Sequence, residues 1–361
     1  MHQLRFVCFL LFLMACRKTG PTIQPFAEKI LAVSAINQRI FDQLKESGEV
    51  DWSSWDDLSL WSAIVQSDSI VAVGYQPIGF REDPGWISNI DLNSAGWKDA
   101  RGQVLRILPK DGWSGKEVWP EKVLPVVVLH IRSFFDLQRL RRSSLVRYIE
   151  PMGYDRHLAN TSTQLESSSG CGSNTPTWEI QAGVHYTTIA PAAKQSWNYP
   201  GHGIPAAWNR TTGRGVKIFL IDTGSSSVQD NLGVAFNSGA SYGRTLERIV
   251  TLPQNSFLGV PIGSPETAED ACGHGTSMAG AMAAPRCSDG NAVGIAYNCN
   301  LITCRAASDV FLDESRELKG VVDGFTNAAN RTDVRIISMS MGRVTSSSYL
   351  RDAVRYAYGK G

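Results

Sequence analysis

The segment Cys272-Gly-His-Gly-Thr-Ser-Met-Ala-Gly-Ala-Met-Ala-Ala-Pro285 decides the fold, because it is built almost entirely from small residues. A helix with so little side-chain bulk can lie almost directly on the surface beneath it. Pro285 ends that helix. His274 stands at its start, where a glycine on either side lets the backbone bend and leaves the imidazole uncrowded. The segment therefore predicts a close-packed helix that begins with a histidine placed to move protons.

A second stretch, Gly215-Val-Lys-Ile-Phe-Leu-Ile-Asp-Thr-Gly224, is an apolar run that ends abruptly in a carboxylate. Such a run is typical of a parallel strand that is covered on both faces. Asp222 is therefore predicted at the carboxyl end of a central strand, where open α/β sheets have their ligand crevice. An aspartate at a strand end and a histidine at a helix start are two members of a Ser-His-Asp triad.

These two stretches carry a resemblance to a known family. Ile221-Asp-Thr-Gly224 resembles the aspartate motif of subtilisin-like serine proteases, and His274-Gly-Thr-Ser-Met-Ala-Gly280 is similar to their histidine motif, in the same order along the chain. The resemblance implies an α/β, subtilisin-like three-layer fold with a parallel sheet and a serine endopeptidase activity on peptides and proteins. It also implies catalytic roles for Asp222 and His274.

Beyond His274, strand-like and helix-like segments alternate, which favours a parallel sheet with helices on both faces. Within them, Ser340-Met-Gly342 resembles the family segment whose backbone forms one wall of the substrate groove. The resemblance implies that Ser340, Met341 and Gly342 bind an extended peptide by adding it as a strand. The expected elements are a strand at 300–305, a helix at about 314–329, a strand at 334–340 and a helix at about 347–358.

The N-terminus reads as a secretion signal, because a charged start is followed by an apolar core that is too short to span a bilayer as a mature helix. Its end, Leu13-Met-Ala-Cys16, resembles the bacterial lipoprotein cleavage box. That likeness implies lipidation of Cys16 and attachment to the cell envelope through a buried acyl chain. The alternative is a plain signal peptide with an incidental cysteine, in which case the protein is secreted.

The stretch from Leu137 to Pro151 is similar to the close of the inhibitory propeptide of subtilisin-like precursors, a short helix followed by an edge strand that ends in Glu-Pro. It implies an α+β propeptide domain that acts as folding template and intramolecular inhibitor, and the alternative is an unrelated small α+β domain. The predicted organisation is a signal peptide at 1–16, a helical and linker region at 17–60, the propeptide domain at 61–154, a linker and processing region rich in Ser, Thr, Asn and Gly at 155–195, and part of the catalytic domain at 196–361.

The net charge and the cysteines bear on three further questions: nucleic-acid partners, disulfides and metal sites. A formal net charge of +1 gives no electrostatic reason to expect a nucleic-acid partner. Export would place the later cysteines in an oxidising compartment, where disulfides can form. The sequence offers Cys272 with Cys287 and Cys299 with Cys304 as candidate pairs without deciding between pairings, and the first requires the chain to turn back after Pro285. Calcium sites are common in the family, but the sequence matches no calcium ligand set and no cofactor is expected. A metal site made of Cys272, His274 and Asp222 is the weaker alternative, since the sequence has no close Cys-x-x-Cys pair.

The family also requires a serine nucleophile and an asparagine for the oxyanion hole, and both follow the position that Gly361 occupies in this sequence. We therefore expect the polypeptide as written to be an incomplete and inactive protease, and the alternative is a peptide-binding envelope lipoprotein without catalysis. Ser277 lies in a Gly-Thr-Ser string, but it is only three residues from His274 on one helix and belongs to the histidine motif. His202, in a loop rich in Gly and Pro, is expected to be structural.

Overall fold

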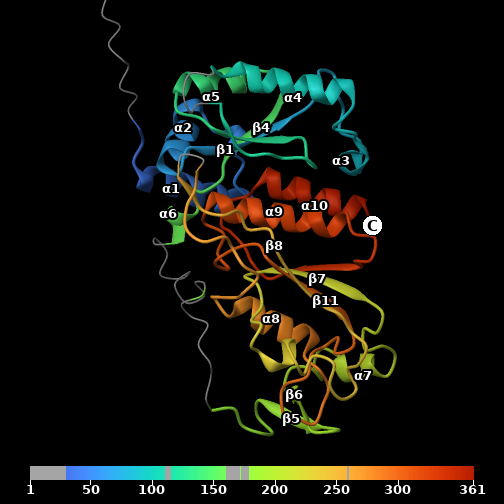
Figure 1. Ribbon diagram of the computed structural model, residues 1–361. Coiled ribbons are helices and arrows are strands. Elements are labelled where there is room, and N and C mark those ends of the chain that lie inside the picture. Colours follow the sequence, from blue (N-terminus) through green and yellow to red (C-terminus); the bar gives the residue numbers. More distant parts are fainter. Residues whose placement is uncertain (1–29, 110–114, 160–170, 172–178, 258–259) are drawn as a thin grey trace, which may run out of the picture.

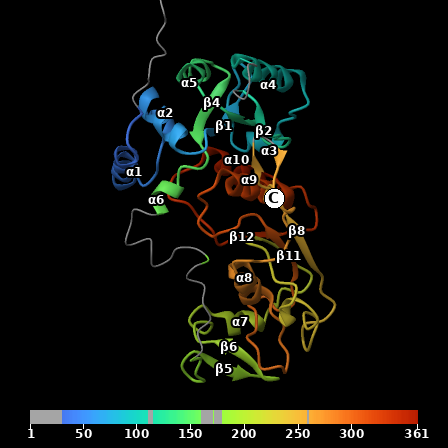
Figure 2. The same ribbon diagram turned by 60° about the vertical axis from the view of Figure 1, so that its left-hand side comes forward.

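Two four-stranded sheets lie on either side of the helices α9 and α10 in the computed structural model, which describes residues 30–109, 115–159, 171, 179–257 and 260–361 (Figure 1). A smaller lobe with a two-stranded hairpin lies at the far end from the N-terminal sheet (Figure 2). The helices are α1 (Val33–Ser47), α2 (Asp57–Gln66), α3 (Trp86–Asn89), α4 (Ala95–Ile107), α5 (Phe134–Arg141), α6 (Arg156–Ala159), α7 (Ile204–Trp208), α8 (His274–Ala283), α9 (Ser315–Ala329) and α10 (Ser348–Gly359). The strands are β1 (Ile70–Tyr75), β2 (Glu117–Trp119), β3 (Val126–His130), β4 (Val146–Pro151), β5 (Tyr186–Ile189), β6 (Ala193–Ser196), β7 (Lys217–Asp222), β8 (Leu246–Val250), β9 (Ser256–Phe257), β10 (Val260–Pro261), β11 (Asn300–Arg305) and β12 (Ile336–Met339).

The N-terminal sheet is antiparallel, with the strand order β2-β3-β1-β4, so β4 is an edge strand. Its side chains alternate between two cores, as a period of two requires. Val71 and Val73 of β1 pack into a core with α1, α2 and α5, whereas Ala72 faces the opposite side. Ile36 and Trp55 belong to the first core, so the packing is continuous across the predicted boundary at residue 60.

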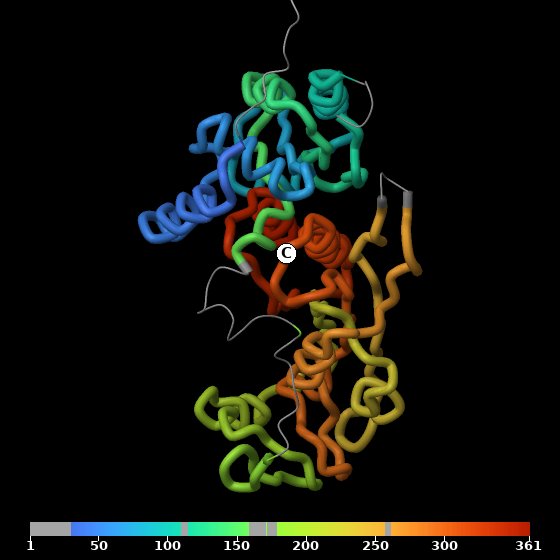
Figure 3. The backbone as a smooth tube through the Cα atoms, turned by 90° about the vertical axis from the view of Figure 1, so that its left-hand side faces the viewer, coloured from blue at the N-terminus to red at the C-terminus, as the bar shows by residue number. Residues whose placement is uncertain are grey.

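The opposite face of this sheet lies against α9 and α10 (Figure 3). Both parts of the chain contribute side chains to one apolar core there. Glu150, near the end of β4, fixes the start of α10. Its carboxylate accepts hydrogen bonds from Ser347 Oγ (2.6 Å) and from the backbone N–H groups of Ser348 (2.7 Å) and Tyr349 (2.9 Å). A carboxylate at a helix N-terminus satisfies orphan N–H groups and complements the helix dipole. The N-terminal part is therefore joined to the helical layer by apolar packing and by charge.

The second sheet is parallel, with the strand order β12-β7-β11-β8. Ile218 and Leu220 of β7 face α8, whereas Phe219 and Ile221 face α9. This three-layer arrangement confirms the predicted fold, and β11 coincides with the strand predicted at 300–305. The helices predicted near residues 314 and 347 are α9 and α10.

Asp313, which lies just ahead of α9, is a partly buried carboxyl group with other acidic side chains nearby. Burial, together with repulsion from Glu314, Asp309 and Asp155, raises the pKa of Asp313 to about 6. Because the folded protein holds this proton more tightly than the unfolded chain, Asp313 destabilises the fold progressively as the pH rises from about 4 to about 6.

We expect Asp313→Asn to remove this dependence. The variant gains about 1–2 kcal/mol over the natural chain at pH 8, after a discount for partial solvent exposure, and nothing at pH 4. Melting temperatures across that pH range measure the difference, with the exposed Asp83→Asn as control. An equal gain at both ends of the range would contradict the prediction.

Candidate active site

The close approach of α8 to the sheet depends on Gly275. A Cβ atom added there would lie 2.2 Å from the carbonyl oxygen of Gly224 and 3.1 Å from Asp222 Oδ1. Gly273, which precedes the helix, has a φ of 85°, a left-handed conformation that glycine adopts without strain. The predicted helix of small residues therefore sets its first turn directly against the loop that follows β7, and His274 is in that turn.

Asp222 and His274 lie in contact. Asp222 is the last residue of β7 and is fully buried, and its Oδ1 lies 2.9 Å from Nδ1 of His274. The backbone N–H of Thr223 donates to the same Oδ1 at 2.8 Å. Burial raises the pKa of Asp222, and the hydrogen bonds from His274 and Thr223 oppose that rise. With Nδ1 engaged by the carboxylate and about a quarter of its side chain exposed (23%), His274 is arranged to exchange a proton through Nε2.

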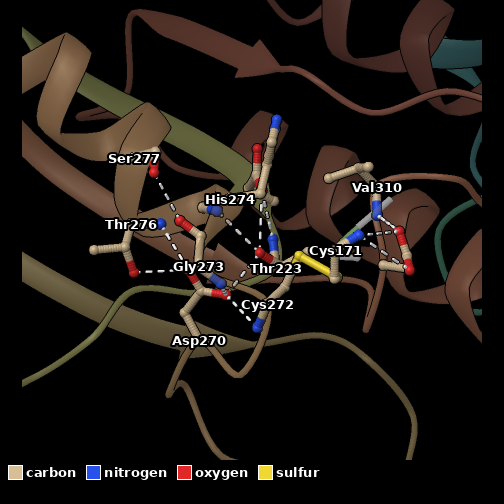
Figure 4. Close-up of polar contacts among 12 residues, drawn as sticks. Cys171, Thr223, Asp270, Cys272, Gly273, His274, Thr276, Ser277 and Val310 are labelled. Atoms are coloured by element: carbon tan, nitrogen blue, oxygen red, sulfur yellow. Dashed lines mark hydrogen bonds and ion pairs between the residues drawn. A yellow bond between two sulfur atoms is a disulfide. The ribbon is translucent and has the colours of Figure 1, made fainter. Parts of the chain in front are cut away.

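Asp270 supports this pair and was missed by the sequence reasoning (Figure 4). One of its oxygens, Oδ1, accepts from Thr223 Oγ1 (2.8 Å) and from the N–H of Gly273 (2.8 Å). The other, Oδ2, accepts from the N–H (2.8 Å) and Oγ1 (2.7 Å) of Thr276. Asp270 thus links the start of α8 to the residue after Asp222. An aspartate just ahead of a predicted helix is a capping signal that could have revealed it.

The cysteine pairing differs from the candidate pairs. Cys272 forms a disulfide with Cys171, whereas Cys287, Cys299 and Cys304 carry free, buried thiols. Neither candidate pair, Cys272–Cys287 or Cys299–Cys304, is therefore formed. Cys272 and Cys287 flank a helix that holds its ends too far apart for a disulfide, and Cys299 and Cys304 are fully buried in separate cores. The disulfide also removes Cys272 as a thiolate ligand, which overturns the alternative of a metal site with His274 and Asp222.

The disulfide gives a direct prediction for peptide mapping. Tryptic digestion without a reducing agent is expected to leave peptide 157–194 covalently joined to peptide 249–286, because these carry Cys171 and Cys272. Alkylation in denaturant is expected to label Cys287, Cys299 and Cys304 before any reduction. A link between peptides 249–286 and 287–305 in the mass spectrum would instead support the pairing that the structure rejects.

The disulfide brings Cys171 beside the segment ahead of α9 (Figure 4). Its N–H donates to Asp309 Oδ1 (3.3 Å), and its sulfur lies 3.4 Å from the carbonyl oxygen of Ser308. Cys171, which precedes the parallel sheet in the sequence, is thus bonded covalently to a residue two positions before His274.

The Ser340–Gly342 segment directly follows β12, but its last residue is not a free edge. The N–H of Gly342 donates to the carbonyl of Val310 (3.1 Å), and the carbonyl of Gly342 accepts from the N–H of Leu312 (2.8 Å). Gly342 is therefore already paired with the loop ahead of α9. Any peptide that adds as a strand here must replace these bonds.

Ser277 and His202, the other serine and histidine considered from the sequence, take no part in the contact between Asp222 and His274. Ser277 Oγ donates to the carbonyl of Gly273 at 2.9 Å, one turn back in its own helix, as Figure 4 shows. His202 lies exposed in the turn ahead of α7.

Cys16 lies outside the described residues. Within the described ranges, no three His, Cys, Asp or Glu side chains gather as a metal site built from them would require. None of the described helices has the length and apolarity to cross a membrane.

Comparisons with known proteins find a protease family and individual proteases that are similar to this chain. Residues 213–361 match the family described as Peptidase S8, subtilase family. An intracellular serine protease of Paenibacillus polymyxa is 31% identical over 153 residues, covering 42% of this chain and 41% of that protein. Thermitase of Thermoactinomyces vulgaris is 27% identical over 157 residues (44% and 48%). The alkaline protease of Alkalihalobacillus alcalophilus is 30% identical over 183 residues (50% and 40%).

A solved structure of a mutant of the epidermin leader peptide processing serine protease of Staphylococcus aureus is also similar. It shares 17% identity at a TM-score of 0.45, over 81% of this chain and 59% of that one. The chain spans less than half of the length of the three curated relatives named above. The sequence motifs around Asp222 and His274 lie within or at the start of the matched range, and residues 213–361 are similar to the subtilase family.

Proposed function

We propose that this chain is the precursor of an exported serine endopeptidase in which Asp222 orients His274 for catalysis. The observation that carries the proposal is the 2.9 Å contact between Asp222 Oδ1 and His274 Nδ1 at the carboxyl end of a central parallel strand. In such a site the histidine takes the proton of a serine hydroxyl while the serine oxygen attacks the peptide carbonyl. The proton then passes to the leaving amine, and water hydrolyses the acyl-enzyme.

The serine nucleophile and the oxyanion asparagine are, in this proposal, supplied by residues outside the 361-residue sequence. The Gly-Thr-Ser string at 275–277 belongs to the histidine motif, and Ser277 Oγ is already bonded to Gly273. In a subtilisin, loss of the serine alone lowers turnover by about 10⁶-fold. The 361-residue chain alone is therefore proposed to be inactive.

The N-terminal part is proposed to act as propeptide, both as folding template and as inhibitor. Its apolar face shares a core with α9 and α10, and Glu150 binds the start of α10. A cut within residues 155–195 would separate the two parts. The substrate is proposed to be an extended peptide along Ser340, Met341 and Gly342, which displaces the pairing of Gly342 with Val310 and Leu312.

Export and a lipid anchor at Cys16 complete the proposal. A disulfide between Cys171 and Cys272 suits an oxidising compartment outside the cytoplasm. Expression in a bacterial host with a radiolabelled fatty acid is expected to label the chain, and Cys16→Ser is expected to abolish the label. A label that persists in the variant, or protein retained in the cytoplasm, would contradict the anchor.

The peptidase proposal is tested with a fluorophosphonate probe, which reacts with an activated serine. The product of the gene read beyond the codon for Gly361 is expected to react, and His274→Ala is expected to abolish the reaction. The 361-residue chain is expected to stay unlabelled. A longer product that folds but does not react would favour the alternative, a peptide-binding envelope lipoprotein without catalysis.

A further inference from the structure

Asp155 has a completely buried carboxylate that residues far along the chain bind. Its Oδ1 accepts from the Arg343 guanidinium at 2.8 Å and from Thr345 Oγ1. Its Oδ2 accepts from the backbone N–H groups of Val344 (2.7 Å) and Thr345 (3.0 Å). Asp155 is 0% exposed. Four donors from three consecutive residues, one of them charged, thus surround a single carboxylate, which is a strong arrangement for this anion.

The residues that bind the Asp155 carboxylate belong to the candidate peptidase domain. Arg343–Thr345 follows Gly342, the last residue of the proposed groove wall, and precedes Ser347, the cap of α10. The side chain of Arg343 is only 5% exposed. Its Nε and Nη1 are buried and find no hydrogen-bond acceptor among the residues that the structure describes. A buried guanidinium with unused donors requires a negatively charged partner.

Asp155, by contrast, belongs to the part that a processing cut would release. Asp155 lies 188 residues before Arg343, between the end of β4 and α6, at the start of the predicted linker. Departure of the N-terminal part from α9 and α10 would carry Asp155 away and leave Arg343 buried without its carboxylate. The site is therefore suited to exchange one carboxylate for another.

We propose that Arg343–Thr345 is a carboxylate-binding subsite next to the peptide groove. Asp155 fills it in the intact chain, and an acidic side chain of a bound peptide fills it once Asp155 has left. The preference for acidic peptides as substrates rests on the proposed peptidase function. Binding of a carboxylate by Arg343–Thr345 does not rest on the peptidase function, so each of these proposals can be wrong while the other holds.

The first test is chemical rescue in the full 361-residue chain with Asp155→Ala. Sodium formate is expected to raise the melting temperature of this variant by several degrees relative to sodium chloride at the same ionic strength, because it refills the vacated carboxylate position. Neither the natural chain nor the double variant Asp155→Ala with Arg343→Met is expected to respond. If Asp155→Ala is too unstable to purify, its refolding yield from urea gives the same comparison. No difference between formate and chloride would overturn the proposal.

The second test uses a fluorescent peptide with the sequence of residues 150–159 and a matched peptide with asparagine in place of Asp155. Fluorescence anisotropy with the Asp155→Ala chain is expected to show at least about tenfold tighter binding of the aspartate peptide, and the Arg343→Met change is expected to remove that preference. Equal affinity for the two peptides, or a preference that survives Arg343→Met, would overturn the proposal. Neither assay requires turnover, so an inactive chain still gives an answer.

Discussion

Gly275→Ala is expected to lower the free energy of unfolding by about 3–5 kcal/mol and to separate His274 from Asp222. The added methyl group would sit 2.2 Å from the carbonyl oxygen of Gly224, a distance that van der Waals repulsion forbids. That oxygen is backbone in the loop directly after β7, so no side-chain rotation relieves the clash. The first turn of α8 must move away, and His274 moves with it. Chemical denaturation measures the stability.

Gly280→Ala in the same helix is the matched control. A Cβ atom there meets nothing within 4 Å, so alanine is expected to be neutral or to stabilise by up to about 1 kcal/mol through its helix propensity. The contact itself is followed by the NMR signal of the His274 Nδ1 proton, which is expected to persist in Gly280→Ala and to be lost in Gly275→Ala. Equal stability of the two variants would show that α8 does not lie as close to the loop as its packing indicates.

The sequence predicted those elements whose conformation is determined by their own short segment. The small residues of α8, the apolar run of β7 and the strand at 300–305 each specify their own conformation, so these elements and the Asp222–His274 contact could be foreseen. The strand β8 was not foreseen. Its five residues include Glu247 and Arg248, which break the apolar pattern of a buried strand.

The features that escaped prediction depend on segments that meet only in the folded chain. The partner of Cys272 lies 101 residues before it, and no local spacing indicates that approach. The pairing of Gly342 with Val310 and Leu312 depends on how the loop before α9 crosses the end of β12. Asp155 was assigned to the linker from composition, yet its carboxylate is bound by Arg343–Thr345. Composition reports the average solvation of a segment and not the partner of one side chain.

Asp222→Asn is expected to move the proton of the neutral His274 imidazole from Nδ1 to Nε2. We expect this change of tautomer to lower the turnover of the proposed enzyme by about 10⁴-fold, as the same substitution does in Ser-His-Asp enzymes. The carboxylate only accepts, so it selects the tautomer with the proton on Nδ1, 2.9 Å away. An asparagine amide in the same place can donate to Nδ1, which moves the proton to Nε2 and removes the base that faces the serine. Turnover is measured on the product of the gene read beyond the codon for Gly361.

The tautomer can be read without turnover, and this separates a catalytic role of Asp222 from a merely structural one. The ¹⁵N shifts of His274 at neutral pH are expected to exchange between Nδ1 and Nε2 in Asp222→Asn, while those of the exposed His202 serve as an unchanged internal reference. Burial opposes the charge on Asp222, so asparagine removes an unfavourable buried charge and the fold is expected to survive the change. A variant that keeps both the natural tautomer and the natural turnover would show that the contact between Asp222 and His274 does not orient a catalytic base.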